Sequence, residues 1–382
     1  MAIKRARRGA VSPFIVMDVM EAAAARERSG ADVIHMEVGQ PSTPAPALVR
    51  EAAAKAVQRE RLGYTVAAGI VPLRQAIADW YGRRYGNPVE LDRVFVTTGS
   101  SAGFSLAFLS AFEAGDRVAM ALPGYPAYRN ILTALGLDVV YIQAGLETGY
   151  QPTPEHLEAV EGQIDGLIVA SPANPTGSMI SRAKFERLVR YCEAQGIRLI
   201  SDEIYHGIEF GETATTAADL SDTAIVINSF SKYFSMTGWR LGWMIVPPDL
   251  ARSVECLAQN MFISAPSPSQ AAALAAFDAG EELDRNVAVY RANRDLLVKE
   301  LPRVGFPRLA PADGAFYIYA DVADRTDDSA AFCRRMLDEV GIAATPGIDF
   351  DPIRGRQAVR FSYAGSTQEM AEAISRLADW SG

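Results

Sequence analysis

The chain has 382 residues, enough for a large core shared between two domains, and its composition is that of an ordinary globular protein. Its formal net charge of −9 argues against a nucleic-acid partner, because proteins that bind phosphate backbones present a basic face. Its apolar runs are shorter than the roughly 18 residues that a membrane helix needs, so we expect no membrane partner.

The N-terminal stretch begins basic and then turns apolar. Pro13 and Asp18 interrupt the apolar part, so this stretch predicts a basic arm leading into a helix rather than a secretory signal. The cysteines, Cys192, Cys256 and Cys333, are far apart and lack the spacing of a zinc site or a disulfide framework. We therefore expect a cytoplasmic protein without a metal site.

Short apolar runs rich in β-branched residues alternate with stretches of helical periodicity from residue 94 onward. The clearest helix is 181–195, which starts at Ser181 and stops before Gly196. Such alternation predicts a mostly parallel sheet with helices on both faces. The expected strands are 94–96, 118–120, 139–142, 167–169, 198–200, 225–227 and 243–246.

The C-terminal part predicts a second, smaller α/β domain. A long helical pattern runs from about Glu281 to about Leu301, and strand-like runs follow at 314–319 and 358–363 with a helix between them. The predicted division is an N-terminal arm and part of the small domain in 1–47, a large domain in 48–282, and the small domain in 283–382.

Small, hydroxylic or ionisable residues follow four of the expected strands. In an open α/β sheet, ligands bind at the carboxyl ends of the strands, so these segments predict the functional site. The segments are 97–101, 171–177, 202–205 and 228–232.

The first of these segments contains Gly99-Ser100-Ser101, before a helix that we expect to begin near Ala102. A helix N-terminus with adjacent hydroxyls can bind phosphate. A turn rich in glycine and serine is often only a turn, so this motif alone leaves both interpretations open.

The run Ser229–Arg240 is more informative, because Lys232 stands there among hydroxyls and aromatic side chains. A lysine in water has a pKa of about 10.4 and is a poor nucleophile at neutral pH. Desolvation beside another cation lowers that pKa, and the free amine can then form an imine with an aldehyde. Arg240 could supply that positive charge and bind a phosphate group. The alternative is a surface lysine in a loop.

Seven motifs in order resemble the fold-type-I pyridoxal-phosphate enzymes of the class I/II aminotransferase family, subgroup I. The resemblance covers essentially the whole length. It implies a large domain with a mostly parallel central sheet flanked by helices, a smaller α/β domain, and transfer of an amino group from an L-amino acid to a 2-oxo acid. The motifs are Gly39-Gln40-Pro41, Gly99-Ser100-Ser101, Pro123-Gly124-Tyr125-Pro126, Asn174-Pro175-Thr176-Gly177, Asp202-Glu203-Ile204-Tyr205, the Ser229–Arg240 run, and Arg360.

The same resemblance implies roles around pyridoxal 5′-phosphate. Lys232 would hold the cofactor as a Schiff base and then move the proton of the substrate Cα. Asp202 would pair with the pyridine nitrogen, Tyr205 and Asn174 would hydrogen-bond the phenolic oxygen, and Tyr125 would stack on the ring. Without the resemblance, Asp202 could be a helix N-cap, the Asn174 segment a β-turn and Tyr125 a core residue.

Further roles concern the phosphate, the substrate and the subunits. Arg360 would bind the substrate carboxylate, with the Gly39 backbone and Asn174 nearby; otherwise it could belong to a surface ion pair. Tyr64 would reach the phosphate of the neighbouring subunit, which implies a homodimer with shared sites, although alone it could be a surface aromatic. The remaining phosphate ligands would be Gly99, Ser100, Ser101, Ser229, Ser231 and Arg240.

One departure from the family bears on the substrate. Members that prefer dicarboxylates use an extra cation for the side-chain carboxylate, and one version places a lysine beside the phosphate loop, where this chain has Ala102. We therefore do not expect aspartate specificity, and the aromatic residues favour a neutral or aromatic substrate.

Among the other functions of the same fold, an elimination reaction on the same cofactor stays open, whereas a regulatory or non-catalytic role is disfavoured. A carbon–sulfur β-lyase or another elimination enzyme would share Lys232, Asp202 and Arg360. A transcription regulator would need a fused DNA-binding domain, and a non-catalytic binding protein would be expected to lose Lys232.

Overall fold

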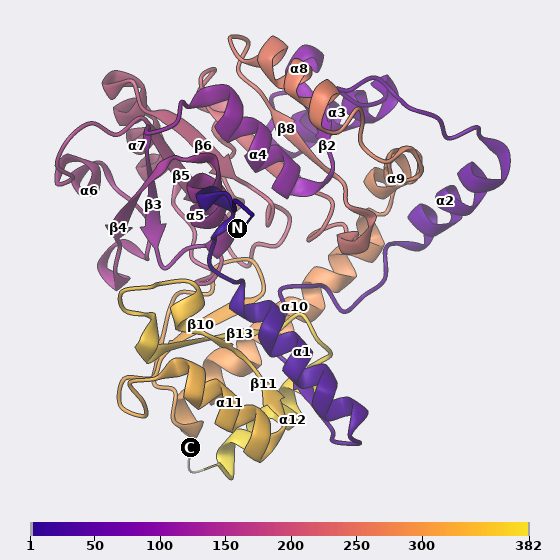
Figure 1. The fold of residues 1–382 in the computed structure, drawn as a ribbon. Helices are drawn as coiled ribbons and strands as arrows, with labels where there is room; N and C mark the ends of the chain where they lie inside the picture. Colours follow the sequence, from indigo (N-terminus) through magenta and orange to yellow (C-terminus); the bar gives the residue numbers. More distant parts are fainter. Residues whose placement is uncertain (1–2, 381–382) are drawn as a thin grey trace.

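The computed structural model describes residues 3–380, which form two lobes. Figure 1 shows a larger lobe of magenta and orange elements above a smaller lobe built mainly from the yellow C-terminal part. Helix α10 (Gly280–Glu300) lies between them, as the helical pattern from about Glu281 predicted. The division at residues 47 and 282 stays a prediction, and α10 runs through the second of these boundaries.

The larger lobe is built on a seven-stranded sheet, and each predicted strand is present within two residues of its expected bounds. The four pairs β3–β4, β3–β5, β5–β6 and β6–β7 are parallel, whereas β8 is antiparallel to β2 and β7. The mostly parallel sheet is therefore confirmed. In spatial order the strands are β2 (Val94–Thr97), β8 (Gly242–Ile245), β7 (Ile225–Ser229), β6 (Arg198–Asp202), β5 (Gly166–Ala170), β3 (Arg117–Leu122) and β4 (Asp138–Gln143).

Both faces of this sheet are buried, which explains why its strands are continuous apolar runs. Leu167 and Val169 of β5 pack into one core, and Ile168 between them packs into the other. Burying each such side chain stabilises the fold by roughly 1.5–3 kcal/mol. The first face is covered by α2 (Ala47–Arg59), α3 (Val71–Tyr85), α6 (Pro154–Glu158), α7 (Arg182–Gln195) and α9 (Ser267–Ala273), and the second by α4 (Gly99–Ala111), α5 (Pro126–Leu135) and α8 (Ala251–Met261).

In two helices, α7 and α4, the expected and the observed ends can be compared. Helix α7 ends at Gly196, whose φ of 70° closes the helix as expected. Helix α4 begins at Gly99, so the expected start near Ala102 is wrong. Because Gly99 adopts a positive φ of 71°, the chain turns directly from β2 into α4. Ser100 and Ser101 therefore lie in the first turn of the helix.

The smaller lobe confirms the predicted second α/β domain. Its four-stranded sheet is antiparallel, and the expected strand at 314–319 begins only at Tyr317. Its elements are β9 (Arg308–Leu309), β10 (Tyr317–Asp321), α11 (Ser329–Val340), β12 (Thr345–Pro346), β13 (Ala358–Ser362) and α12 (Thr367–Ala378), beside a parallel pair of β1 (Ile34–His35) and β11 (Ile342–Ala343).

The basic N-terminal arm leads into α1 (Ile15–Arg28), as predicted. Figure 1 shows α1 lying across the smaller lobe. Its Ala23 packs with Leu337 and Ala343 of that lobe. Within residues 3–380, the helices are all too short or too polar to cross a membrane.

Candidate active site

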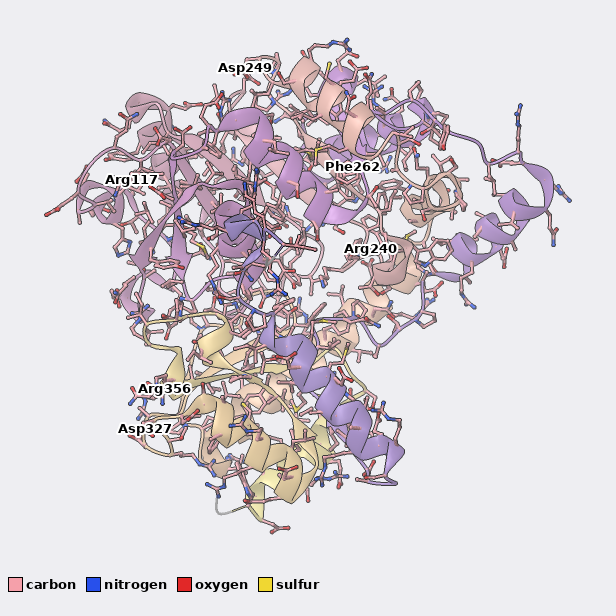
Figure 2. The ribbon with its side chains drawn as sticks, viewed as in Figure 1. Arg117, Arg240, Asp249, Phe262, Asp327 and Arg356 are labelled. Carbon is pink, nitrogen blue, oxygen red and sulfur yellow. The ribbon has the colours of Figure 1, made fainter. Side chains whose placement is uncertain are left out.

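A cavity of about 300 Å³ brings together residues from both lobes and from α1. Figure 2 shows Arg240 on the inner side of the larger lobe, whereas Arg117 and Asp249 lie at its outer edge. The predicted site residues that line the cavity are Gly39, Ser100, Ser101, Tyr125, Asn174, Asp202, Tyr205, Ser231, Lys232, Arg240 and Arg360.

Lys232 follows β7 and lies in this cavity. Its Nζ donates a hydrogen bond of 2.5 Å to the Gly39 carbonyl and lies 5.7 Å from the centre of the Tyr205 ring. Desolvation, with the positive charges of Arg360 and Arg240, lowers the pKa of Lys232 to about 8, although Asp202 opposes this shift. The amine is therefore neutral in a useful fraction of molecules near neutral pH.

Asp202 ends β6 and is buried beneath the cavity. The Tyr128 hydroxyl donates to its Oδ2, and the Ile204 amide donates to its Oδ1 at 3.2 Å. Burial raises the pKa of Asp202 to about 6, while these hydrogen bonds and Lys232 act in the opposite direction. A cationic partner inside the cavity would hold this carboxyl in its ionised form.

The start of α4 and Arg240 form a cradle for an anion. Free amides at a helix N-terminus attract phosphate, and Ser100, Ser101 and Ser231 add hydroxyls around the same cavity. A Cβ at Gly99 would lie 2.6 Å from Arg240 Nη2, so a side chain at this position would displace the guanidinium. Glycine therefore keeps the cradle open, although Gly99 itself does not line the cavity.

Two other predicted residues lie outside the cavity lining. Ser229 is buried, and its Oγ donates to Ser231 Oγ at 2.9 Å. Tyr64 is 84% exposed and lies beside the segment Ser264–Pro268, away from the cavity of its own chain. Their roles as cofactor ligands stay predictions. Ser229 would act by way of its hydrogen bond to Ser231, and Tyr64 would reach the cofactor of another subunit.

Arg360 of β13 is buried between two aromatic rings. Its guanidinium carbon lies 4.4 Å from the Tyr317 ring centre and 4.6 Å from that of Phe350. One terminal nitrogen donates to Asn174 Oδ1 at 2.9 Å, and the other donates to the Glu37 carbonyl and to Thr345 Oγ1. The guanidinium is thus held in one orientation at the cavity, where its positive charge suits binding of a carboxylate.

Several cavity residues were not identified from the sequence. Tyr128 contacts Asp202, and the Tyr317 hydroxyl shares a hydrogen bond of 2.7 Å with Tyr205. The start of α1 forms the apolar part of the cavity wall. The sequence predicted a helix at Phe14–Met20 but did not indicate that it would lie at the cavity. The α1 wall, as we call it, consists of Phe14, Val16, Met17 and Met20.

The donor set fits pyridoxal 5′-phosphate. The open cradle at Gly99 suits the phosphate, the buried carboxyl of Asp202 suits the ring nitrogen, and the lowered pKa of Lys232 suits the aldehyde.

Comparisons with known proteins agree with this geometry. A family model described as aminotransferase class I and II matches residues 31–377. The valine–pyruvate aminotransferase of Mycobacterium tuberculosis is 52% identical over 384 residues, which cover 100% of this chain and 99% of that protein.

Solved structures are similar over both lobes. The crystal structure of an aminotransferase from Mycobacterium tuberculosis superposes with a TM-score of 0.97 at 52% identity, covering 99% of each chain. The aspartate aminotransferase from Thermus thermophilus with maleate has a TM-score of 0.92 at 30% identity, again over 99% of each chain.

Proposed function

Because this chain belongs to the class I and II aminotransferase family, we propose that it transfers the amino group of a small apolar L-amino acid such as valine to pyruvate. The chain is an enzyme that moves amino groups between amino acids and 2-oxo acids. The identity of the donor and the acceptor is the proposal. The observation that carries it is the α1 wall, an apolar surface in the cavity that also holds Lys232 and Arg360.

The proposed cofactor is pyridoxal 5′-phosphate, on which this family depends. Lys232 would bind it covalently, Asp202 would hold its ring nitrogen, and Tyr205 and Asn174 would contact its phenolic oxygen. The phosphate ligands would be Ser100, Ser101, Ser231 and Arg240, with Ser229 behind them and Gly99 leaving room, and Tyr125 would cover the ring. When bound, the cofactor withdraws electrons from the substrate Cα and so makes its proton acidic.

The protein's own groups then position the substrate and move the proton. Arg360 binds the α-carboxylate, with the Gly39 backbone and Asn174 beside it, and this fixes the direction of the Cα–H bond. Lys232 Nζ, neutral in part because of its lowered pKa, takes that proton and returns it. The carboxylate of Asp202 stabilises positive charge beneath the cavity.

The cavity favours an apolar donor side chain over an acidic one. Among residues 3–380, the cations that line it are Lys232, Arg240 and Arg360, and each already has a role. A second carboxylate on the substrate would therefore lack a cationic partner, and an unpaired charge is costly to desolvate. The name of the relative from Mycobacterium tuberculosis, which is 52% identical, supports valine and pyruvate as the pair.

A donor panel tests this proposal. With purified, cofactor-loaded protein and pyruvate as acceptor, kcat/KM for L-valine should exceed that for L-aspartate by at least about a hundredfold. Each donor is also tested with 2-oxoglutarate, to identify the acceptor. A preference for aspartate under these conditions would refute the assignment of the donor.

We further propose that the active unit is a cytoplasmic homodimer. Figure 1 shows α2 and the segment that follows it projecting from the larger lobe. This segment carries Tyr64 and Val66, which are 84% and 62% exposed. A second copy of the chain would cover these side chains and place Tyr64 at the partner's phosphate cradle. The buried thiols of Cys192 and Cys333 suit a reducing compartment.

A further inference from the structure

Asp349 ends the short 3₁₀ helix Gly347–Asp349 that follows β12 in the smaller lobe, yet it caps α1. The residue is fully buried, and its two carboxylate oxygens accept hydrogen bonds from the Ile15 and Val16 amides at 3.3 and 3.2 Å. The N-cap residue of α1 is Phe14, which has no polar side chain. Free amides at a helix start need an acceptor, and a carboxylate also stabilises the positive end of the helix dipole. Asp349 thus supplies the cap from 333 residues away in the sequence.

The loop around Asp349 is attached to the larger lobe as well. The Arg129 guanidinium donates to the Asp349 carbonyl at 2.7 Å, and the Gly124 amide donates to the Phe350 carbonyl at 3.0 Å. The Phe350 ring lies 4.6 Å from the Arg360 guanidinium. The position of the cap is therefore set relative to both Tyr125, which follows Gly124, and Arg360.

The two ends of α1 are held differently. The far end packs through Ala23 against the smaller lobe and pairs Arg26 with Asp338 at 3.0 Å. The first turn, in contrast, has the two hydrogen bonds to Asp349 and an edge-to-face contact of 5.7 Å between Phe14 and Tyr125. The N-cap and first turn of α1 carry Phe14, Val16 and Met17 of the α1 wall, so the placement of the wall depends strongly on the cap.

We propose that Asp349 is a positioning residue for donor selectivity. By capping α1 it keeps the α1 wall in the cavity, where the wall packs against the apolar side chain of the amino donor. Because this inference concerns the donor side chain, it rests on the proposed function.

Hydrogen–deuterium exchange of the cofactor-free protein tests whether Asp349 holds the first turn of α1. In Asp349→Ala, amides of the first turn of α1 should exchange about fivefold faster or more, whereas those near Arg26 should change little. Asp349→Asn, which keeps one acceptor oxygen, should give a smaller increase in the exchange rate. This variant replaces the alanine variant if the latter does not fold. The matched control is Asp351→Asn, because Asp351 is also buried but accepts from Ile353 and Arg354 within its own loop.

Kinetics test the functional half. The ratio of kcat/KM for L-valine to that for L-alanine should fall about fivefold in Asp349→Ala, because L-alanine has too small a side chain to use the wall. Phe14→Ala, which removes part of the α1 wall but keeps the cap, should lower the same ratio while the first turn of α1 exchanges more slowly than in Asp349→Ala. Asp351→Asn should leave the ratio unchanged.

Two results would overturn the proposal. Unchanged exchange in both Asp349 variants would show that the cap does not hold α1, and faster exchange with an unchanged valine-to-alanine ratio would show that α1 does not select the donor. A wild-type preference for aspartate would instead refute the proposed function, while the exchange data would still decide the role of the cap.

Discussion

Lys232 shows how burial prepares a single side chain for chemistry. Its amine lies in a cavity with two arginines, and both desolvation and their charges favour the neutral form. Only the neutral amine attacks an aldehyde, so the environment that lowers the pKa of the lysine also makes its amine reactive.

The lowered pKa of Lys232 predicts a pH profile for cofactor capture. The neutral fraction is one half at the pKa, so the rate at which borohydride fixes pyridoxal 5′-phosphate to the cofactor-free protein should rise with pH, be half-maximal near 8 and level off at higher pH. Mass spectrometry should locate the label at Lys232, with Lys232→Ala as the background control. An inflection near 10.5, the ordinary value, would mean that the amine is solvated.

Glu203, the neighbour of Asp202, is a buried acid to which the proposed mechanism assigns no role. Its Oε1 accepts from the Ala217 amide at 2.8 Å and from Ser201 Oγ at 3.0 Å. Its Oε2 lacks a hydrogen-bond partner among residues 3–380. Burial raises the pKa of Glu203 from 4.5 to about 8. Since the unfolded chain releases this proton more easily, Glu203 should destabilise the fold increasingly as the pH rises from 4.5 to 8.

Glu203→Gln should remove this pH dependence. The melting temperature of the variant minus that of the wild type should increase from pH 5 to pH 8, because glutamine fills the same space without ionising. Calorimetry at several pH values measures the effect, with the exposed Glu212→Gln as control. A constant difference between variant and wild type at all pH values would contradict the raised pKa.

At the scale of elements, the junction of β2 and α4 builds the phosphate cradle. Gly99 turns the chain with a φ of 71° and leaves space beside Arg240. A strand that runs directly into a helix places the free amides of the helix at the carboxyl end of the sheet. Local backbone conformation thus forms the cradle that we propose for the cofactor phosphate.

Gly99→Ala should weaken binding of pyridoxal 5′-phosphate by about tenfold or more, because the added Cβ would displace Arg240 and the backbone would be strained. Absorbance titration of the cofactor-free protein measures the affinity. Gly115→Ala is the matched control, since Gly115 also has a positive φ, of 96°, but open space around its Cβ position. Equal losses of affinity in both variants would attribute the effect to backbone strain rather than to the cradle.

At the scale of the whole molecule, the exposed Tyr64 predicts that two chains share each site. Tyr64→Ala and Lys232→Ala should each reduce activity strongly. After co-refolding in equal amounts, half of the dimers are hybrids with one intact site of two, so activity should recover to about a quarter of the wild-type level.

The control for this experiment pairs Lys232→Ala with Arg360→Ala. Both residues line the cavity of the same chain, so their hybrids contain no intact site and should recover little activity. Recovery in both mixtures, or in neither, would contradict a shared site that contains Tyr64.

The sequence alone predicted the strands of the seven-stranded sheet, helix α7 and the part of the cavity lining that follows those strands. Strand runs such as 167–169 are recognisable because both faces of the sheet are buried, and the residues after them converge because parallel strands end at one edge. Lys232, Asp202 and Arg240 could therefore be placed together before any contact was known. The resemblance to a family added Arg360 and the roles.

The rest of the cavity wall depends on tertiary packing. Asp349 and the start of α1 are more than 300 residues apart, and neither carries a local signal for the other. In the sequence Tyr128 and Tyr317 look like ordinary aromatic residues. In the folded chain their hydroxyls form hydrogen bonds with Asp202 and Tyr205. Local patterns set conformation over a few residues, whereas these contacts depend on how two lobes and a terminal helix pack against one another.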